Sequence, residues 1–180
     1  MTTVFIGGSR AVSRLNATIR QRLDDLIQRG CLIFIGDANG ADKAVQQHFA
    51  DRDYHNVTVF CMGTCRNNVG KWEIRRVESC SSRRDFVYYA NKDIAMAREA
   101  KCGVMLWDGR SKGTLNNIFN LIGANKKVLV YLSPDRAFHK VSTPQDLDAL
   151  LSRCDPQEMK KIQHRLADIM RAQEALPLRS

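Results

Sequence analysis

Residues 107–114 read Trp-Asp-Gly-Arg-Ser-Lys-Gly-Thr and join an apolar run, 102–106, to a segment with the spacing of a helix. Glycine lets the backbone adopt positive φ and come close to a ligand. The first N–H groups of a helix lack partners within that helix, and together with the helix dipole they favour a phosphate. The stretch therefore predicts a strand, an anion-binding turn and a helix, in that order.

Two earlier turns have the same character. The apolar run 3–6 ends at Gly-Gly-Ser-Arg (7–10), and the run 31–35 ends at Gly-Asp-Ala-Asn-Gly (36–40). Each of these glycine-rich turns follows a strand-like run and precedes a helical pattern. One such turn is a weak signal, whereas three of the same kind indicate a shared pocket.

Short apolar runs and amphipathic segments alternate along the first 133 residues. Strands are expected at 3–6, 31–35, 57–61, 103–107 and 127–132, and helices at 15–27, 41–49, 84–100 and 114–123. Continuously apolar strands that alternate with helices are typical of a parallel sheet covered on both faces. The sequence thus predicts an α/β protein with a Rossmann-like three-layer fold and a parallel sheet of about five strands. The segment 62–82 shows no sustained period and is expected to be mostly irregular.

The pattern changes after residue 135. Two similar stretches, 143–146 and 155–158, each combine a cap residue, a proline at the first helical position and an acidic or amide side chain. They predict a short helix over 144–153 and a longer one from 156 to about 175. We therefore divide the chain into a Rossmann-like nucleotide-binding domain, 1–135, and a C-terminal helical extension, 136–180. The extension is expected to pack on the same domain or at a homo-oligomer interface.

The predicted sheet also indicates where a ligand binds. In such sheets ligands lie outside the carboxyl ends of the strands, at the point where the strand order reverses. The three glycine-rich turns follow the first, second and fourth predicted strands, so we expect them to meet at one edge of the sheet. The candidate nucleotide-binding residues are Gly7, Gly8, Ser9, Arg10, Gly36, Asp37, Gly40, Trp107, Gly109, Ser111, Gly113 and Thr114.

Different roles are expected within this set. Ser111, Gly113 and Thr114 are expected to donate to a phosphate at a helix N-terminus. Asp37 has the chemistry to bond a ribose hydroxyl. Trp107 has two interpretations, stacking on a base or packing at the sheet edge.

Composition narrows the classes of partner. The chain of 180 residues carries a formal net charge of +9, which favours anionic partners such as nucleotides or nucleic acid. Part of this charge lies in the basic segment 65–85, which is either a solvated loop or a binding patch. The six cysteines and four histidines lack ligand spacing, so no metal site is expected and no cofactor is indicated. No apolar run has the length of a membrane span and no signal sequence is recognised, so a cytoplasmic protein is expected.

Four motifs follow one another along the chain. They are Phe-Ile-Gly-Gly-Ser-Arg (5–10), Gly-Asp-Ala-Asn-Gly-Ala-Asp (36–42), Lys-Asp-x-x-Met (92–96) and Trp-Asp-Gly-x-Ser-x-Gly-Thr (107–114). In this order they resemble the SLOG superfamily, which includes DNA-processing protein A-like and Lonely-Guy (cytokinin-activating) proteins. The resemblance covers about residues 3–133, and the second and fourth motifs are the specific ones. It implies a Rossmann-like fold that binds nucleotides or nucleotide-derived ligands.

One position departs from the Lonely-Guy pattern. Those proteins hydrolyse the N-glycosidic bond of nucleoside 5′-monophosphates, and their signature ends in Gly-Thr-x-x-Glu, whereas Asn117 stands at the last position here. A carboxylate stabilises an oxocarbenium-like centre or accepts a proton, and a neutral amide does neither. The substitution argues against hydrolysis by that mechanism.

Three functions follow from these patterns. The first is binding of a nucleotide or nucleotide-derived small molecule, as a sensor or binding domain. The second is an N-glycosidic hydrolase in which Asp93 or Asp108 replaces the missing glutamate as the catalytic carboxylate. The third is binding of single-stranded nucleic acid through the cations of the basic segment, Arg66, Lys71, Arg75, Arg76, Arg83 and Arg84.

Overall fold

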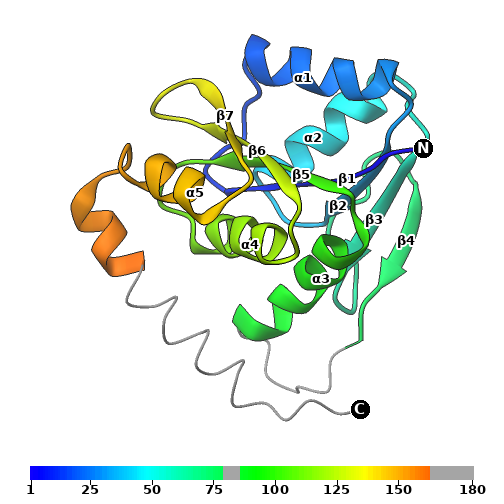
Figure 1. Cartoon of the computed structure of the whole chain (residues 1–180). Helices are drawn as coiled ribbons and strands as arrows, with labels where there is room; N and C mark the ends of the chain where they lie inside the picture. The colour runs from blue at the N-terminus through cyan, green and yellow to red at the C-terminus, as the bar shows by residue number, and fades with distance from the viewer. Residues whose placement is uncertain (79–85, 163–180) are drawn as a thin grey trace.

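A seven-stranded sheet forms the middle layer of the computed structural model, which describes residues 1–78 and 86–162 (Figure 1). The strands are β1 (Thr3–Gly8), β2 (Leu32–Gly36), β3 (Val57–Cys61), β4 (Glu73–Arg76), β5 (Cys102–Trp107), β6 (Lys127–Leu132) and β7 (Ala137–Val141). Their order across the sheet is β4-β3-β2-β1-β5-β6-β7. All neighbours are parallel except β6 and β7, which are antiparallel.

Helices cover both faces of this sheet. They are α1 (Ala17–Gln28), α2 (Ala41–Ala50), α3 (Phe86–Glu99), α4 (Lys112–Gly123) and α5 (Pro144–Leu151). Helices α1 and α2 lie together on one face, and α3, α4 and α5 lie on the other (Figure 1). Each face has its own apolar core, with Leu23 and Phe49 in the first and Met96 and Ile118 in the second. The predicted Rossmann-like three-layer α/β fold is confirmed.

Local sequence explains where several helices begin and end. The Asn16 side chain accepts from the N–H of Ile19 at 3.0 Å and caps α1, and Gly30, with φ of 60°, follows the end of that helix. Helix α5 begins with a capping box between Thr143 and Asp146, and Pro144 occupies its first turn. A further helix begins near residue 156 and is described as far as 162, so the rest of the helix expected to 175 lies outside the described residues.

The sheet has two strands more than the sequence pattern predicts. Strand β4 lies in the segment expected to be irregular, and it forms by parallel pairing with β3, with Glu73 opposite Thr58. Strand β7 lies in the segment expected to be a helical extension, where it forms a hairpin with β6. Phe138 of β7 packs edge-on against Tyr131 of β6, with ring centroids 5.3 Å apart. Long-range pairing therefore produces both strands.

The C-terminal segment packs against the same core as the sheet. Leu147, Leu150, Met159 and Ile162 are buried in the cluster that contains α4 and β6. Met159 and Ile162, the buried apolar residues of the second predicted helix within the described residues, are therefore covered by this chain.

Strand order fixes the position of the ligand edge. The chain runs outward from β1 through β2 to β4, then crosses back so that β5 pairs with the other side of β1. The order reverses between β1 and β5, where Gly8 lies opposite Leu106. The turns after β1 and β5 are therefore neighbours, as the switch-point rule requires.

Candidate functional site

A cavity of about 570 Å³ opens at the carboxyl ends of β1, β2 and β5. Its walls come from the turn after β1, the start of α2, helix α3 and the first turns of α4. The lining residues are Phe5, Gly7, Gly8, Ser9, Arg10, Gly36, Ala38, Asp42, Arg66, Tyr89, Ala90, Lys92, Asp93, Met96, Asp108, Arg110, Ser111, Lys112, Gly113, Thr114, Asn116 and Asn117.

Eight of the twelve predicted residues line this cavity, and four do not. Those that line it are Gly7, Gly8, Ser9, Arg10, Gly36, Ser111, Gly113 and Thr114. Asp93 and Asp108, the two candidate carboxylates, also line it. The three glycine-rich turns therefore contribute to one cavity, although not through every residue expected.

The N-terminus of α4 forms one end of the cavity. Ser111 is the N-cap, and its Oγ accepts from the N–H of Thr114 at 3.4 Å and from Thr114 Oγ1 at 3.0 Å. Asp108 supports the turn, because its Oδ1 accepts from the N–H groups of Arg110 and Ser111 at 3.1 and 2.8 Å. A Cβ atom added to Gly113 would meet nothing within 4 Å, so this backbone borders open space. Helix α4 therefore begins at the cavity wall with side-chain caps from Ser111 and Asp108 and with an open position at Gly113.

The turn after β1 is shaped by packing within the protein. A Cβ atom on Gly8 would lie 2.6 Å from the carbonyl oxygen of Leu106 and 2.7 Å from the Cβ of Ala41. The Ser9 N–H donates to the Leu106 carbonyl at 2.8 Å, and the Ser9 side chain is buried. Glycine at position 8 thus lets β1, β5 and α2 approach one another, and Arg10 remains exposed at the rim.

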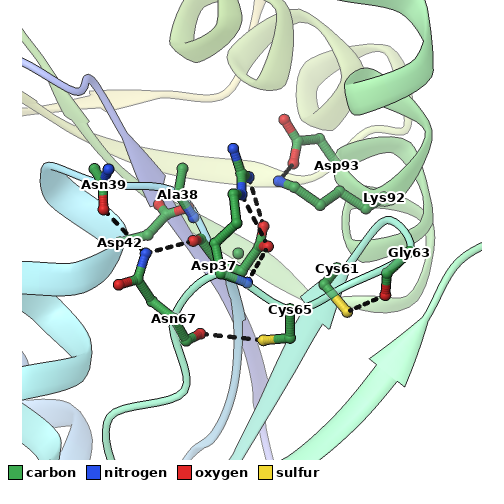
Figure 2. A network of polar contacts seen from close by, with 12 residues as sticks. Asp37, Ala38, Asn39, Asp42, Cys61, Gly63, Cys65, Asn67, Lys92 and Asp93 are labelled. Carbon is green, nitrogen blue, oxygen red and sulfur yellow. Dashed lines mark hydrogen bonds and ion pairs between the residues drawn. The ribbon is translucent and has the colours of Figure 1, made fainter. Parts of the chain in front are cut away.

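A buried charge cluster also lines the cavity. Lys92 is only 5% exposed, and its Nζ lies 2.5 Å from Asp93 Oδ1 (Figure 2). A Cβ atom on Gly36 would lie 2.5 Å from Asp42 Oδ2 and 2.9 Å from Lys92 Nζ. Gly36 therefore makes room for this cluster, which is a different role from the ligand contact expected of it.

The cluster shifts the ionisation of its members. Burial raises the pKa of Asp42 to about 7, and the nearby Asp93 and Asp37 charges add to the rise, whereas the Lys92 charge lowers it. Burial opposes the charge of Lys92, but Asp93 and Asp42 outweigh it and raise the pKa of that ammonium. Lys92 therefore stays a cation, while Asp42 changes its charge near neutral pH.

Asp37 does not line the cavity, contrary to its expected role at a ribose hydroxyl. The residue is 1% exposed, and its carboxylate accepts from Nε and Nη2 of Arg66 at 3.0 and 2.7 Å. Burial opposes ionisation, but the hydrogen bonds and charge of Arg66 outweigh it and hold the pKa of Asp37 below its ordinary value. The Arg66 guanidinium, 5.2 Å from the centre of the Tyr89 ring, faces the cavity in its place.

Of the two interpretations of Trp107, packing fits the structure and stacking on a base does not. Its side chain is fully buried, and its Nε1 donates to the Ser111 carbonyl at 3.0 Å, so it anchors the turn. Gly40 has φ of 84° and packs against the backbone of Arg10. Gly109 has φ of 78° and borders Cys154 and Leu132. These two glycines are required by backbone conformation and packing.

Two consecutive amide residues of α4 also line the cavity. Asn116 and Asn117 are each 5% exposed. Asn117 Nδ2 donates to Asp93 Oδ2 at 3.3 Å, whereas Asn117 Oδ1 and Asn116 Nδ2 have no hydrogen-bond partner. Asn116 and Tyr89 were not among the predicted site residues, because a polar residue on a helix has the same sequence signature as a solvated one.

The basic segment is less available than its sequence indicates. Besides the Arg66 pair with Asp37, Arg75 Nη1 lies 2.5 Å from Glu99 Oε2. Lys71 and Arg76 are exposed, and Arg83 and Arg84 lie outside the described residues. Within the described residues, no three His, Cys, Asp or Glu side chains are grouped to hold a metal ion. No helix of that part of the chain has the length and apolar character to cross a membrane.

Comparison with known proteins identifies a likeness in fold. No protein-family model matches the sequence, and no curated protein matches it. Among solved structures, DNA processing protein A from Helicobacter pylori, described for its single-stranded DNA binding mode, matches with a TM-score of 0.58 at 14% identity. The match covers 93% of this chain and 81% of that one. The chain has a DNA processing protein A-like fold.

Proposed function

We propose that this chain binds a nucleotide or nucleotide-derived small molecule, as a sensor or binding domain, with the phosphate at the N-terminus of α4. One observation carries the proposal. The first turn of α4 and the unpartnered buried amides of Asn116 and Asn117 line the same cavity, at the switch point of the sheet. From the four sequence motifs and the DNA processing protein A-like fold we also infer membership of the SLOG superfamily.

The charges and size of the cavity support a phosphate at this end. Arg10 and Arg110 are exposed at its rim and supply cations for charge-assisted hydrogen bonds. The volume of about 570 Å³ falls within the range of roughly 300–1,000 Å³ that is usual for small-molecule sites. The half-buried ring of Tyr89 offers an aromatic surface on which a base can stack.

The test is isothermal titration calorimetry of wild type and Gly113→Val with three classes of ligand. They are mononucleotides, nucleoside diphosphates and dinucleotides. A branched side chain at this position fills the space that the phosphate occupies, so Gly113→Val should abolish binding without loss of folding. Gly123→Val is the matched control. Gly123 lies at the far end of the same helix and also has nothing within 4 Å of its Cβ position, so this variant should bind as wild type does. If Gly113→Val binds as wild type does, the proposal that the phosphate lies at the N-terminus of α4 is wrong.

The second candidate is single-stranded nucleic acid. One solved structure that resembles this chain is of a protein described for its single-stranded DNA binding mode, and the chain carries a net charge of +9. Within the described residues of the basic segment, Arg66 and Arg75 are exposed but ion-paired with acidic side chains, whereas Lys71 and Arg76 are exposed cations for which no ion pair is found. If the segment binds the backbone, the double variant Lys71→Ala/Arg76→Ala should weaken binding of a labelled oligonucleotide and reduce its salt dependence. Binding that Gly113→Val abolishes instead would place the oligonucleotide's phosphate at α4.

A further inference from the structure

Asp42 places a buried carboxyl group in the wall of the cavity. Its side chain is 6% exposed, and its Oδ2 accepts from the N–H of Ala38 at 3.2 Å. The neighbouring ammonium of Lys92 is paired with Asp93, and no ion pair is found for Asp42 within the residues that the structure describes. This carboxyl group therefore lacks the close cation that usually accompanies a buried carboxylate.

The cluster around Asp42 has one ammonium for two carboxyl groups. A Cβ atom on Gly36 would lie 2.5 Å from Asp42 Oδ2 and 2.9 Å from Lys92 Nζ, so the two groups are neighbours (Figure 2). Lys92 Nζ also lies 2.5 Å from Asp93 Oδ1. Two carboxylates that share one site oppose each other's ionisation, and burial opposes it further. The raised pKa of Asp42, about 7, agrees with this arrangement.

Charged groups from three other parts of the fold act on Asp42. Lys92 and Asp93 belong to α3, Asp37 follows β2, and Arg66 lies in the loop after β3. The pKa values of Lys92 and Arg66 are raised and that of Asp37 is lowered, so these three groups keep their charges where Asp42 titrates. The other charged side chains that line the cavity are Arg10, Asp108, Arg110 and Lys112.

An anion in the cavity favours the protonated form of Asp42, because like charges repel. A sphere with the cavity's volume, about 570 Å³, is about 10 Å across, which sets the scale of the distance between a bound phosphate and this carboxyl group. At an effective dielectric constant of about 20, one unit charge at about 10 Å shifts a protonation equilibrium by about tenfold. A phosphate that enters the cavity should therefore draw a proton onto Asp42.

We propose that the binding of an anionic ligand in this cavity is coupled to the uptake of a proton by Asp42, so that affinity falls as the pH rises through neutrality. This inference rests on the nucleotide site proposed above, of which it uses only the negative charge of the ligand. Asp42 acts through its charge and needs no contact with the ligand. The site thus responds to pH as well as to the concentration of its ligand.

Calorimetry in two buffers of different ionisation enthalpy measures the proton directly. The probes are the 5′-monophosphates of adenosine, guanosine, cytidine and uridine, titrated at pH 7.5 into wild type and Asp42→Asn. The second pKa of a phosphate monoester is near 6, so the probes are almost wholly dianions at this pH. Wild type should take up about half a proton for each ligand bound, and Asp42→Asn close to none.

The affinity of the same proteins at pH 6 and pH 8.5 gives a second measurement. Asparagine resembles the protonated carboxyl group, so Asp42→Asn should bind as wild type does at pH 6 and about three- to tenfold more tightly at pH 8.5. The ionisation of the ligand is common to both proteins and cancels in the ratio of their affinities. Asp53→Asn is the matched control, because the Asp53 side chain is 92% exposed and does not line the cavity, and it should follow wild type at both pH values.

The outcomes separate this inference from the function on which it rests. Binding by wild type without proton uptake, or uptake that persists in Asp42→Asn, overturns the role of Asp42 and leaves the nucleotide site standing. If Asp42→Asn does not fold, as judged by circular dichroism, Asp42→Ser carries the same expectation. Absence of binding by every probe at millimolar concentration overturns the nucleotide site and the proton coupling together.

Discussion

Replacing Asp42 with asparagine should remove a pH dependence from the stability of this protein. The Asp42 side chain is 6% exposed, and its pKa is raised from the ordinary 3.8 to about 7, chiefly by burial. Between these values the folded protein holds a proton that the unfolded chain releases. The contribution of Asp42 to stability is therefore present in full below about pH 3.8 and is lost as the pH rises to about 7.

The size of the effect follows from this window. At about 1.36 kcal/mol for each pH unit, the interval from 3.8 to about 7 corresponds to about 4 kcal/mol. Asparagine has nearly the same shape and carries no titrating proton. Lys92 keeps Asp93 as its ion-pair partner in the variant, at 2.5 Å, so the cluster retains a balanced charge pair.

Urea unfolding at a series of pH values from 4.5 to about 8.5 measures this contribution. The stability of Asp42→Asn minus that of wild type should rise steadily with pH and level off above about 7, because all other titrating groups cancel in the difference. Asp53→Asn is the control, since the Asp53 side chain is 92% exposed, and its curve should run parallel to wild type. A flat or falling difference for Asp42→Asn between pH 5 and 7 would refute the reasoning.

Two further substitutions test the turns around the cavity. Gly40→Ala should destabilise the protein by about 3 kcal/mol in urea unfolding at pH 7, because the cost of a side chain at φ of 84° adds to a clash of its Cβ with the Arg10 backbone. Gly30→Ala should destabilise it by only about 1 kcal/mol, because Gly30 has φ of 60° but open space around its Cβ position. Equal losses in the free energy of unfolding would mean that close packing of Gly40 against the Arg10 backbone adds nothing to the cost. Asp37→Asn should lose about 1–2 kcal/mol at pH 7, a modest value because the Arg66 side chain is 37% exposed. Since the pKa of Asp37 is lowered, this difference should shrink as the pH falls below 3.8, and a difference that persists at pH 2.5 in thermal unfolding would contradict the ion-pair account.

The sequence predicts the framework of the site better than the roles of its members. Strand-to-helix turns with glycine were correctly expected to meet at one sheet edge, because parallel strands bring their carboxyl ends together. However, glycine allows close approach to a ligand and to another part of the protein equally well. Gly8 and Gly36 accommodate the protein's own atoms, whereas Gly113 borders open space, and only the folded arrangement separates these cases.

The remaining differences arise from contacts between distant parts of the chain. Asp37 and Arg66 are 29 residues apart, so their pairing has no local signature, and the carboxylate that seemed suited to a ribose is used within the protein. Tyr89 and Asn116 lie on helices whose polar positions usually face water. Their place in the cavity depends on how α3 and α4 pack, which no short pattern encodes.

Strand β4 also has a consequence for how the protein behaves in concentrated solution. It forms one outer edge of the sheet (Figure 1), and three of its four residues, Glu73, Arg75 and Arg76, are charged and exposed. The next strand inward, β3, is Val-Thr-Val-Phe-Cys and is buried along its whole length. Uncovered apolar strands recruit further chains into aggregates, and short charged edge strands discourage this. The short, charged strand β4 is therefore expected to disfavour edge-to-edge pairing between the sheets of two molecules.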